Sequence, residues 1–283
     1  LPAGLSIFPG PQQGALLHPA IPVSSLHMVD LQVLQDDPHR QVVRIADTVR
    51  RPLYPWSPTI HELLLHLESV GFPYAPRLLG IDAEGREVLT YIDGESGGAA
   101  WAKVVEDAGL VAMARLLRDY HEAVRGFRPT AEAGWAACAG TVNAGELVCH
   151  GDFGPWNLVW RGTQPVGILD WDYARPARPI HDVAYALEYV APFRDDGVCI
   201  ESLRYPVPPN RRQRLERFAE AYGLTATAGL VDEVIAQQQD VLQRARQLAA
   251  EGRQPQAAWQ EAGVLDEVVE RIRWSRAHRH LFE

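Results

Sequence analysis

Cysteine is scarce in this sequence, and its scarcity excludes several classes of protein. Only Cys138, Cys149 and Cys199 occur among the 283 residues. Three scattered cysteines are too few for a disulfide framework, and they lack the paired spacing of a zinc site. We therefore expect a protein of the reducing cytoplasm.

Long apolar runs and an excess of positive charge are also missing. No apolar run approaches the roughly 20 residues that a membrane-spanning helix needs. The formal net charge of −9 argues against general nucleic-acid binding, which requires clustered Lys and Arg to neutralise phosphates. The hydrophobic fraction of 47% is ordinary for a globular protein. We therefore expect a soluble protein that binds neither membranes nor nucleic acid.

The first residues differ in composition from the rest of the chain. The stretch LPAGLSIFPGPQQGALLHPAIPV is rich in Pro and Gly, but it lacks the basic start and continuous apolar centre of a secretory signal. We interpret residues 1–35 as an irregular arm. The remaining length is enough for one large domain or two lobes.

Residues 36–94 show the pattern of a small strand-rich lobe with one helix. VVRIADTVRR, residues 42–51, predicts a hairpin that turns at Ala46-Asp47. A helix is predicted from Ser57 to the stop at Gly71, because Pro58 suits its first turn and apolar residues recur on one side. EVLTYI, residues 87–92, predicts a further strand.

Residues 95–283 are mainly helical in pattern. The first long helix carries a buried stripe, and further helices are predicted over 211–222, 230–248 and 264–280. The stripe consists of Leu110, Met113, Leu117, Tyr120 and Val124. Between these helices lie a strand over 146–149 and a hairpin with strands 158–160 and 166–169, joined by a turn at 161–164. We interpret residues 95–283 as a second lobe.

The loop CHGDFGPWNLVW, residues 149–160, carries the chemistry of this second lobe. Asp152 and Asn157 lie on the loop before the hairpin, and Asp170 ends the returning strand. The three oxygen-bearing side chains can therefore converge on one point. Mg²⁺ takes oxygen ligands and keeps only one or two protein carboxylates, which matches Asn157 and Asp170. Asp152 is left to accept a proton.

The pattern HGDxxxxN, followed by an Asp at the end of the next hairpin, resembles the catalytic core of aminoglycoside phosphotransferases and choline kinases. The resemblance implies an α+β, protein-kinase-like fold with a small strand-rich N-lobe and a larger, mainly helical C-lobe. It also implies that ATP or GTP, bound with Mg²⁺, gives its γ-phosphoryl group to a small-molecule hydroxyl. In that reading Asp152 is the catalytic base, and Asn157 and Asp170 hold the metal.

The same resemblance implies a cation on a strand of the small lobe that binds the nucleotide phosphates. We assign Arg50 of TVRRP to this role, with Arg44 and Arg51 as rivals. Glu62, on the following helix, is expected to be either the ion-pair partner of this cation or a solvated charge on the helix surface. We also assign Tyr91 to the nucleotide site.

One stretch departs from the family pattern. Relatives carry a glycine-containing turn over the phosphates, whereas LQDDPHRQ, residues 34–41, has two aspartates and no glycine. Carboxylates there would repel a nucleoside triphosphate. We therefore expect either a displaced turn or weak nucleotide binding.

Several residues near the loop have more than one interpretation. His150 is expected to bond loop backbone, and Asp172 either binds metal or caps the following segment. Asp182 is predicted to cap the next helix, and by resemblance it braces the catalytic loop. Four acids could attract a cationic acceptor or form a solvated face; these are Glu188, Asp195, Asp196 and Glu201.

The acceptor and the activity itself have alternatives. An aminoglycoside-like antibiotic, another antibiotic, a choline-like alcohol or a sugar all fit the motif. A non-catalytic kinase-like protein that binds a nucleotide or another ligand is the main alternative to an enzyme. A metal-dependent hydrolase is a weaker one, because it would need more closely spaced His or carboxylate ligands.

Overall fold

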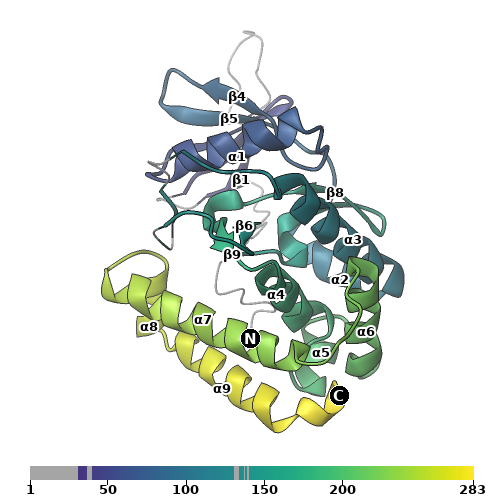
Figure 1. The fold of residues 1–283 in the computed structure, drawn as a ribbon. Helices are drawn as coiled ribbons and strands as arrows, with labels where there is room; N and C mark the ends of the chain where they lie inside the picture. The colour runs from purple at the N-terminus through teal and green to yellow at the C-terminus, as the bar shows by residue number, and fades with distance from the viewer. Residues whose placement is uncertain (1–30, 37–39, 131–133, 137, 139) are drawn as a thin grey trace, which may run out of the picture.

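A strand-rich part and a helical part lie one above the other in the computed structural model of this chain (Figure 1). The structure describes residues 31–36, 40–130, 134–136, 138 and 140–283. Residues 1–30 of the predicted arm lie outside the described residues. The arrangement is the predicted one, with a small N-terminal sheet and a larger, mainly helical remainder.

The N-terminal sheet has five antiparallel strands in the order β1-β2-β3-β5-β4. Its strands are β1 (Leu31–Gln35), β2 (Val42–Ile45), β3 (Thr48–Pro52), β4 (Leu78–Ile81) and β5 (Arg86–Thr90). The predicted hairpin over 42–51 is confirmed, and its tight turn holds Ala46 at a positive φ of 54°. The central strand β3 pairs with β2 on one side and β5 on the other. Successive side chains of β3 therefore point to opposite faces of the sheet.

The predicted boundary of the arm is wrong at its C-terminal end. β1 occupies residues 31–35, which were assigned to the arm, and pairs with β2 through Leu31↔Ile45 and Val33↔Val43. The sequence did not reveal this strand because LQVLQ is short and half exposed, and only its pairing with β2 gives it a place. The sheet therefore begins before the glycine-free turn.

The helix α1 (Ser57–Ser69) lies against the sheet, as predicted from its apolar side (Figure 1). Leu63 and Leu67 are fully buried, and Pro58 occupies the first turn, where a missing backbone N–H costs nothing. Gly71 follows the helix with a φ of 74°, which suits the predicted stop.

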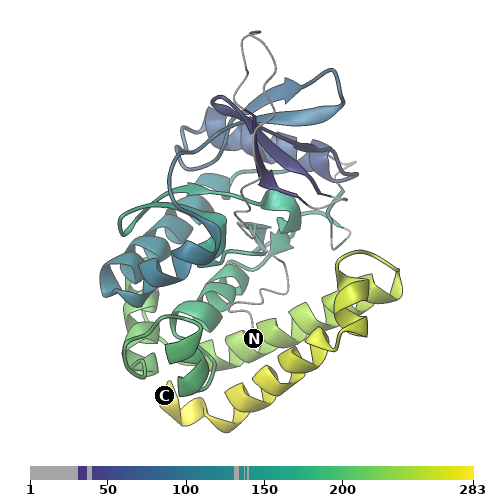
Figure 2. The same ribbon diagram turned by 180° about the vertical axis from the view of Figure 1, so that it is seen from behind.

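The helical part contains the predicted long helices with small shifts at their ends. Its helices are α2 (Trp101–Val105), α3 (Asp107–Val124), α4 (Ile180–Val190), α5 (Asp196–Glu201), α6 (Arg211–Tyr222), α7 (Leu230–Ala250), α8 (Gln256–Glu261) and α9 (Val264–Ala277). All five residues of the predicted stripe on α3 are fully buried. Seen from behind, α7 and α9 run side by side at the bottom of the molecule (Figure 2).

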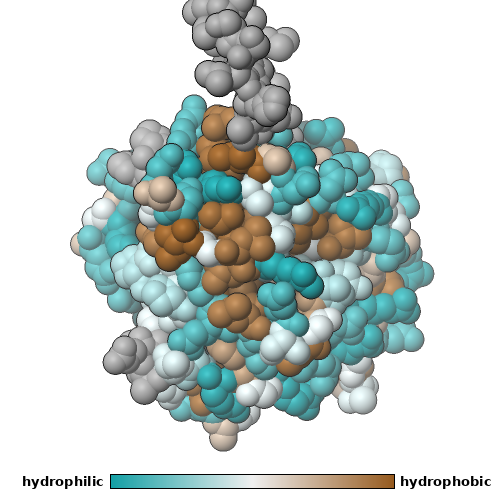
Figure 3. Space-filling model, turned by 90° about the horizontal axis from the view of Figure 1, so that it is seen from above, coloured by the Kyte–Doolittle hydropathy of each residue, from teal (hydrophilic) through white to brown (hydrophobic). Residues whose placement is uncertain are grey.

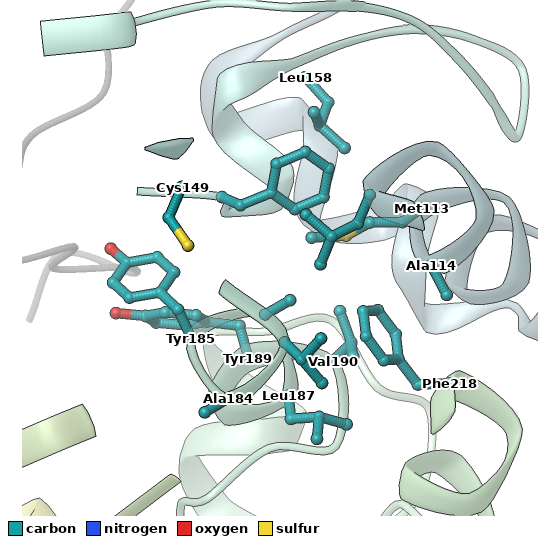
Figure 4. Packing of buried hydrophobic residues seen from close by; sticks show 14 of the residues in the cluster. Met113, Ala114, Cys149, Leu158, Ala184, Tyr185, Leu187, Tyr189, Val190 and Phe218 are labelled. Atoms are coloured by element: carbon teal, nitrogen blue, oxygen red, sulfur yellow. The ribbon is translucent and has the colours of Figure 1, made fainter. Parts of the chain in front are cut away.

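The core of the helical part joins α3, α4 and α6. Met113, Val190 and Phe218 come from these three helices and belong to one buried cluster (Figure 4). Full burial of each such side chain contributes about 1.5–3 kcal/mol. Tyr185 and Tyr189 extend from α4 in another direction, away from Phe218 (Figure 4). This core therefore gives the tyrosines a rigid base.

Two short strand pairs position the loop identified in the sequence. β6 (Leu147–Cys149) pairs with β9 (Arg175–Ala177), and β7 (Leu158–Arg161) pairs with β8 (Gln164–Ile168). The hairpin turn is shorter than predicted, because Gly162 adopts a φ of 61° that a two-residue turn requires. The register Leu158↔Ile168 brings the end of β8 back to the start of β7.

The surface above the N-terminal sheet is mixed in character. Apolar patches interrupt a largely hydrophilic face (Figure 3). Exposed apolar residues on the edge strands include Leu31, Val33, Leu79 and Ile81. Among the described residues, no helix has both the length and the apolar character that crossing a membrane would require.

Candidate active site

The loop after β6 is held by a buried carboxylate beneath it. Asp182, in the first turn of α4, accepts hydrogen bonds from the backbone N–H groups of His150 (2.7 Å) and Gly151 (2.9 Å). His121 Nε2 lies 3.1 Å from the same carboxylate. The predicted bracing contact therefore exists, but the predicted helix cap does not, because α4 begins at Ile180 and Asp182 lies within it.

Asp182 has a lowered pKa although it is fully buried. Burial alone would raise the pKa of this carboxyl, but the hydrogen bond and charge of His121, with smaller effects of His181 and His150, outweigh it. The group is therefore an ionised acceptor in the folded chain. Its charge stabilises a loop that carries the candidate catalytic side chains.

His150 bonds loop backbone, as predicted. Its Nε2 donates to the carbonyl of Leu169 at 2.9 Å, and its Nδ1 faces the backbone N–H of Asp152 at 3.3 Å. Nδ1 must accept in that contact, so one neutral tautomer satisfies both bonds. Burial lowers the pKa of His150, which agrees with a neutral ring. His150 therefore joins the loop to the end of β8.

Asp152 is buried, and two donors fix its carboxylate. The hydroxyl of Tyr185 donates to Oδ1, and Nδ2 of Asn157 donates to Oδ2 at 2.8 Å. Burial raises the pKa of Asp152 well above its ordinary value; the Tyr185 hydrogen bond opposes this rise, and the charge of Asp170 adds to it. A carboxylate with a raised pKa and a fixed orientation can accept a proton.

Asn157 presents a buried oxygen without a protein partner. Its Nδ2 donates to the backbone oxygen of Asp152 (3.0 Å) as well as to its carboxylate, which fixes the amide orientation. Oδ1 has no hydrogen-bond partner among the described residues, although the residue is almost fully buried. An orphaned buried oxygen calls for a ligand. Asn157 and Asp170 both line the pocket between the two parts of the chain, so their oxygens fit a hard cation there.

Asp170 adopts a left-handed backbone conformation, with φ 57° and ψ 67°. Such a conformation is strained for a residue with a side chain and is found at functional sites. The backbone N–H of Leu169 donates to the Asn157 carbonyl at 2.7 Å, which ties the two segments together. Asp170 and Asn157 are therefore brought together as the sequence predicted.

Asp172 connects the helical part to the N-terminal part. Its Oδ1 accepts from the guanidinium of Arg51 and from Nε1 of Trp56 (3.3 Å), and its Oδ2 accepts from Arg40 at 2.9 Å. Both carboxylate oxygens of Asp172 are therefore occupied by donors from the N-terminal part, two of which are arginines. Asp172 is therefore neither a helix cap nor a free ligand in this structure.

The predicted pairing of Arg50 with Glu62 is wrong. Arg50 lies near Asp82, with Nε 3.6 Å from Oδ2, and the carboxylate of Glu62 accepts from the backbone N–H and hydroxyl of Thr130. The reason is that side chains alternate between the two faces of β3. Val49 and Arg51 lie on the face that lines the pocket, and Arg50 lies on the opposite face.

Arg51, one of the two rivals, is the cation of β3 that faces the pocket. It pairs with Glu87 on β5 and with Asp172. His61 of α1 completes this buried network, with Nε2 2.6 Å from Glu87 Oε2. The single lysine of the sequence, Lys103, pairs with Glu95 at 2.8 Å. Arg51 therefore takes the position that was assigned to Arg50.

The rest of the pocket suits a flat apolar group. Its walls come from the sheet, from the segment after β5 and from β7, and Tyr91 lies among them as predicted. The guanidinium carbon of the other rival, Arg44, lies 3.7 Å from the centre of the Tyr91 ring. The apolar lining includes Leu34, Val42, Val49, Pro76, Leu89, Ile92, Val159, Leu169 and Trp171.

Three of the acids that could attract a cationic acceptor have structural partners. Glu188 is buried and lies 2.9 Å from Arg271, Asp195 caps α5, and Asp196 pairs with Arg211 at 2.9 Å. Glu201 is an exposed residue at the end of α5. Asp195, Asp196 and Glu201 are exposed, as the alternative of a solvated face predicts, whereas Glu188 is buried.

Two residues of the site were missed by sequence reasoning. Tyr185 lies one helical turn after Asp182, and this spacing was the available signal, because residues three apart share a helix face. Arg40 lies in the stretch LQDDPHRQ, and no local pattern in this stretch indicates that its arginine reaches the site. The partner of each residue lies more than thirty residues away in the sequence, so the spacing gave the helix face of Tyr185 but not its contact with Asp152.

Comparisons with known proteins agree with this geometry. The sequence profile of the phosphotransferase enzyme family matches residues 126–230. The chain is 34% identical over 202 residues to the trifolitoxin immunity protein of Rhizobium leguminosarum bv. trifolii, covering 69% of this chain and 75% of that protein.

Solved structures of aminoglycoside phosphotransferases share the fold. The GDP complex of aminoglycoside 2'-phosphotransferase-IIIa superposes with a TM-score of 0.57 at 14% identity, covering 88% of this chain and 93% of that one. The gentamicin complex of APH(2")-IIa gives a TM-score of 0.56 at 11% identity, covering 86% and 90%. At these identities the likeness establishes the fold.

The close contact at Gly151 predicts a large loss of stability on substitution. A Cβ at Gly151 would lie 2.1 Å from the carbonyl oxygen of Tyr173, and the φ of 80° already disfavours a side chain. Gly162 is a matched control, because it has a φ of 61° but an added Cβ meets nothing described within 4 Å. Gly162→Ala should cost about 1–2 kcal/mol, and Gly151→Ala more than about 4 kcal/mol. Urea unfolding measures both; equal losses would contradict the close contact.

The raised pKa of Asp152 predicts a dependence of stability on pH. A carboxyl whose pKa is higher in the folded chain binds more protons there, so wild type loses stability as pH rises above about 4, the unfolded value. Asp152→Asn lacks this loss. The Tm of the variant minus the Tm of wild type should therefore increase by roughly several degrees as the pH is raised from 5 to 8. Asp119→Asn, on the exposed side of α3, is the control. A difference that stays constant across this range would contradict the buried carboxyl.

Proposed function

Because the chain belongs to the phosphotransferase enzyme family, we propose that it transfers the γ-phosphoryl group of ATP or GTP to a hydroxyl of a small molecule. One observation carries the proposal. The amide of Asn157 is oriented by Asp152, its Oδ1 has no hydrogen-bond partner within the described part of the chain, and Asn157 lines the same pocket as Asp170. Two candidate metal-binding residues thus line one apolar pocket, and the candidate proton acceptor Asp152 is hydrogen-bonded to one of them.

In this proposal each part of the chain has a separate task. The sheet and the segment that follows it, residues 31–94, hold the nucleotide base between apolar side chains. Residues 95–283 carry the loop and shape the acceptor side. Arg51 binds the phosphates, because it is a permanent cation on the pocket side of β3. Asn157 and Asp170 hold Mg²⁺, which when bound neutralises charge on the phosphate oxygens.

Asp152 performs the proton transfer. The acceptor oxygen forms a bond to the γ-phosphorus while the bond from phosphorus to the β–γ bridging oxygen breaks, and the hydroxyl proton passes to the Asp152 carboxylate. Tyr185 and Asn157 hold that carboxylate in one orientation, so little reorganisation is needed during the reaction. The proton then passes to solvent after the product leaves.

The acceptor we propose is an antibiotic-like compound with a free hydroxyl. The support comes from two similar proteins. One is the trifolitoxin immunity protein, and the other is an aminoglycoside phosphotransferase whose structure contains gentamicin. Glu188, Asp195 and Asp196 do not add to this support, because each has a structural partner. A panel of antibiotics that includes neutral compounds should therefore be screened for phosphorylation.

A metal-dependent hydrolase would need a metal site, and one buried cluster of the described residues has suitable ligand atoms. His121, Cys149 and Asp182 bring their ligand atoms within 4.8 Å of one another. Asp182, however, already accepts from two backbone N–H groups and lies at hydrogen-bond distance from His121. Its oxygens thus hold the loop in place and are not available to activate water.

Mg²⁺ should be required for tight nucleotide binding. We expect Mg·ATP or Mg·GTP at a hundredfold excess over Kd to stabilise the chain by about 2.7 kcal/mol, and EDTA to remove most of this gain. Asn157→Ala should lose the Mg²⁺-dependent part, because it removes one metal-binding oxygen. A thermal-shift assay measures these effects. The absence of any shift with either nucleotide at millimolar concentration would favour the non-catalytic alternative.

Asp152→Asn should separate catalysis from binding. The variant keeps the size of the side chain but loses the base, so phosphoryl transfer should fall by about a hundredfold to ten-thousandfold. Mg·nucleotide should still raise its Tm. Single-turnover transfer to an acceptor found by the screen is the measurement, with Asp119→Asn as control. A variant that turns over at the wild-type rate would remove Asp152 from the mechanism.

A further inference from the structure

Arg40 bridges the two carboxylates that end the β8 segment. Its Nη2 lies 2.6 Å from Asp170 Oδ1 and 2.9 Å from Asp172 Oδ2. The three side chains are mostly buried, with 20%, 13% and 5% of their surface exposed. Charge-assisted hydrogen bonds of this kind are among the stronger polar contacts in proteins.

Arg40 comes from the turn that departs from the family pattern. The turn 34–41 contains no glycine, so it lacks the residue that lets backbone N–H groups approach phosphates closely. Arg40 nevertheless points into the pocket and lines it together with Arg51, Asn157 and Asp170. The sequence predicts that the aspartates of this stretch repel a nucleotide, but its Arg40 places a cation in the pocket.

The charges of the pocket require such a cation. Asp170 lines the pocket, and Asp172 and Glu87 lie next to it through their ion pairs with Arg40 and Arg51. Arg51 is divided between Asp172 and Glu87, and it belongs to the hydrogen-bonded ladder of β3. Arg40 precedes β2 and lies outside the described strands, so both its backbone and its side chain can shift without disturbing the strand pairing that positions Arg51.

We propose that Arg40 is a phosphate-binding residue that exchanges partners when nucleotide binds. This inference rests on the proposed function. In the free chain Arg40 neutralises Asp170 and Asp172. When Mg²⁺ and nucleotide bind, Arg40 releases Asp170 to the metal and contacts the phosphate oxygens instead. A salt bridge in the free protein is thereby replaced by one to the ligand.

The exchange has two consequences of opposite sign. Without nucleotide, Arg40 competes with Mg²⁺ for Asp170, so removing the guanidinium should strengthen binding of Mg²⁺ alone. With nucleotide, Arg40 supplies contacts to the phosphates, so removing it should weaken nucleotide binding even when metal is absent. A residue that merely orders the turn would weaken both.

Calorimetric titration of wild type, Arg40→Ala and Arg40→Gln tests this pair of effects. Each protein is titrated with MgCl₂ alone, with ATP in EDTA, and with Mg·ATP. We expect both variants to bind ATP in EDTA about tenfold to a hundredfold more weakly than wild type, as for the loss of charge-assisted hydrogen bonds. Binding of Mg²⁺ alone should become tighter. Arg77→Ala is the matched control, because that arginine is 67% exposed and lies outside the pocket.

The outcomes separate this inference from the proposed function. If wild type binds no nucleotide with Mg²⁺, the proposed function fails and the inference fails with it. If wild type binds Mg·ATP and the variants bind ATP in EDTA as tightly, only the role of Arg40 is overturned. Parallel weakening of Mg²⁺ and ATP binding also overturns the exchange. Melting curves confirm that each variant is folded, and Arg40→Gln, which keeps most of the length, carries the test if Arg40→Ala unfolds.

Discussion

The buried carboxylate of Asp182 is the interaction on which the rest of the site depends. Two consecutive backbone N–H groups of the loop after β6 point at it, and a third contact comes from His121 on α3. Removing this carboxylate would destabilise the folded chain, because the buried N–H groups that donate to it would be left without an acceptor. The loop path that follows, with Gly151 against Tyr173, then sets where Asp152 and Asn157 lie.

A second set of contacts holds the two parts of the chain together across the pocket. Asp172 accepts from Arg51 of the sheet, from Trp56 before α1 and from Arg40 of the glycine-free turn. These ion pairs act beside a buried apolar cluster that also includes residues of both parts, such as Leu67 of α1 and Tyr120 of α3. Charges arranged in this way are sensitive to a polyanionic ligand, which offers the arginines new partners.

Much of the fold could be predicted because it depends on local patterns. The apolar stripe on α3, the hairpin at Ala46 and the helix α6 all follow from spacing of three to four or of two residues, and the structure confirms them. The motif residues Asp152, Asn157 and Asp170 were identified for the same reason, because short loops on a hairpin leave few possible geometries. β1 escaped prediction, since a short, half-exposed strand is defined by its partner.

The sequence by itself determined the kinds of chemistry this protein has: an acid, an amide and a second acid at the ends of one hairpin, behind a small sheet. Only the tertiary structure decided which cations face them. Arg50 and Arg51 are neighbours in sequence, and the register of β3 against β5 sends one outward and the other into the pocket. Tyr185 and Arg40 reach the site from 33 and 130 residues away from their partners. Such contacts depend on packing between distant segments, which no local pattern encodes.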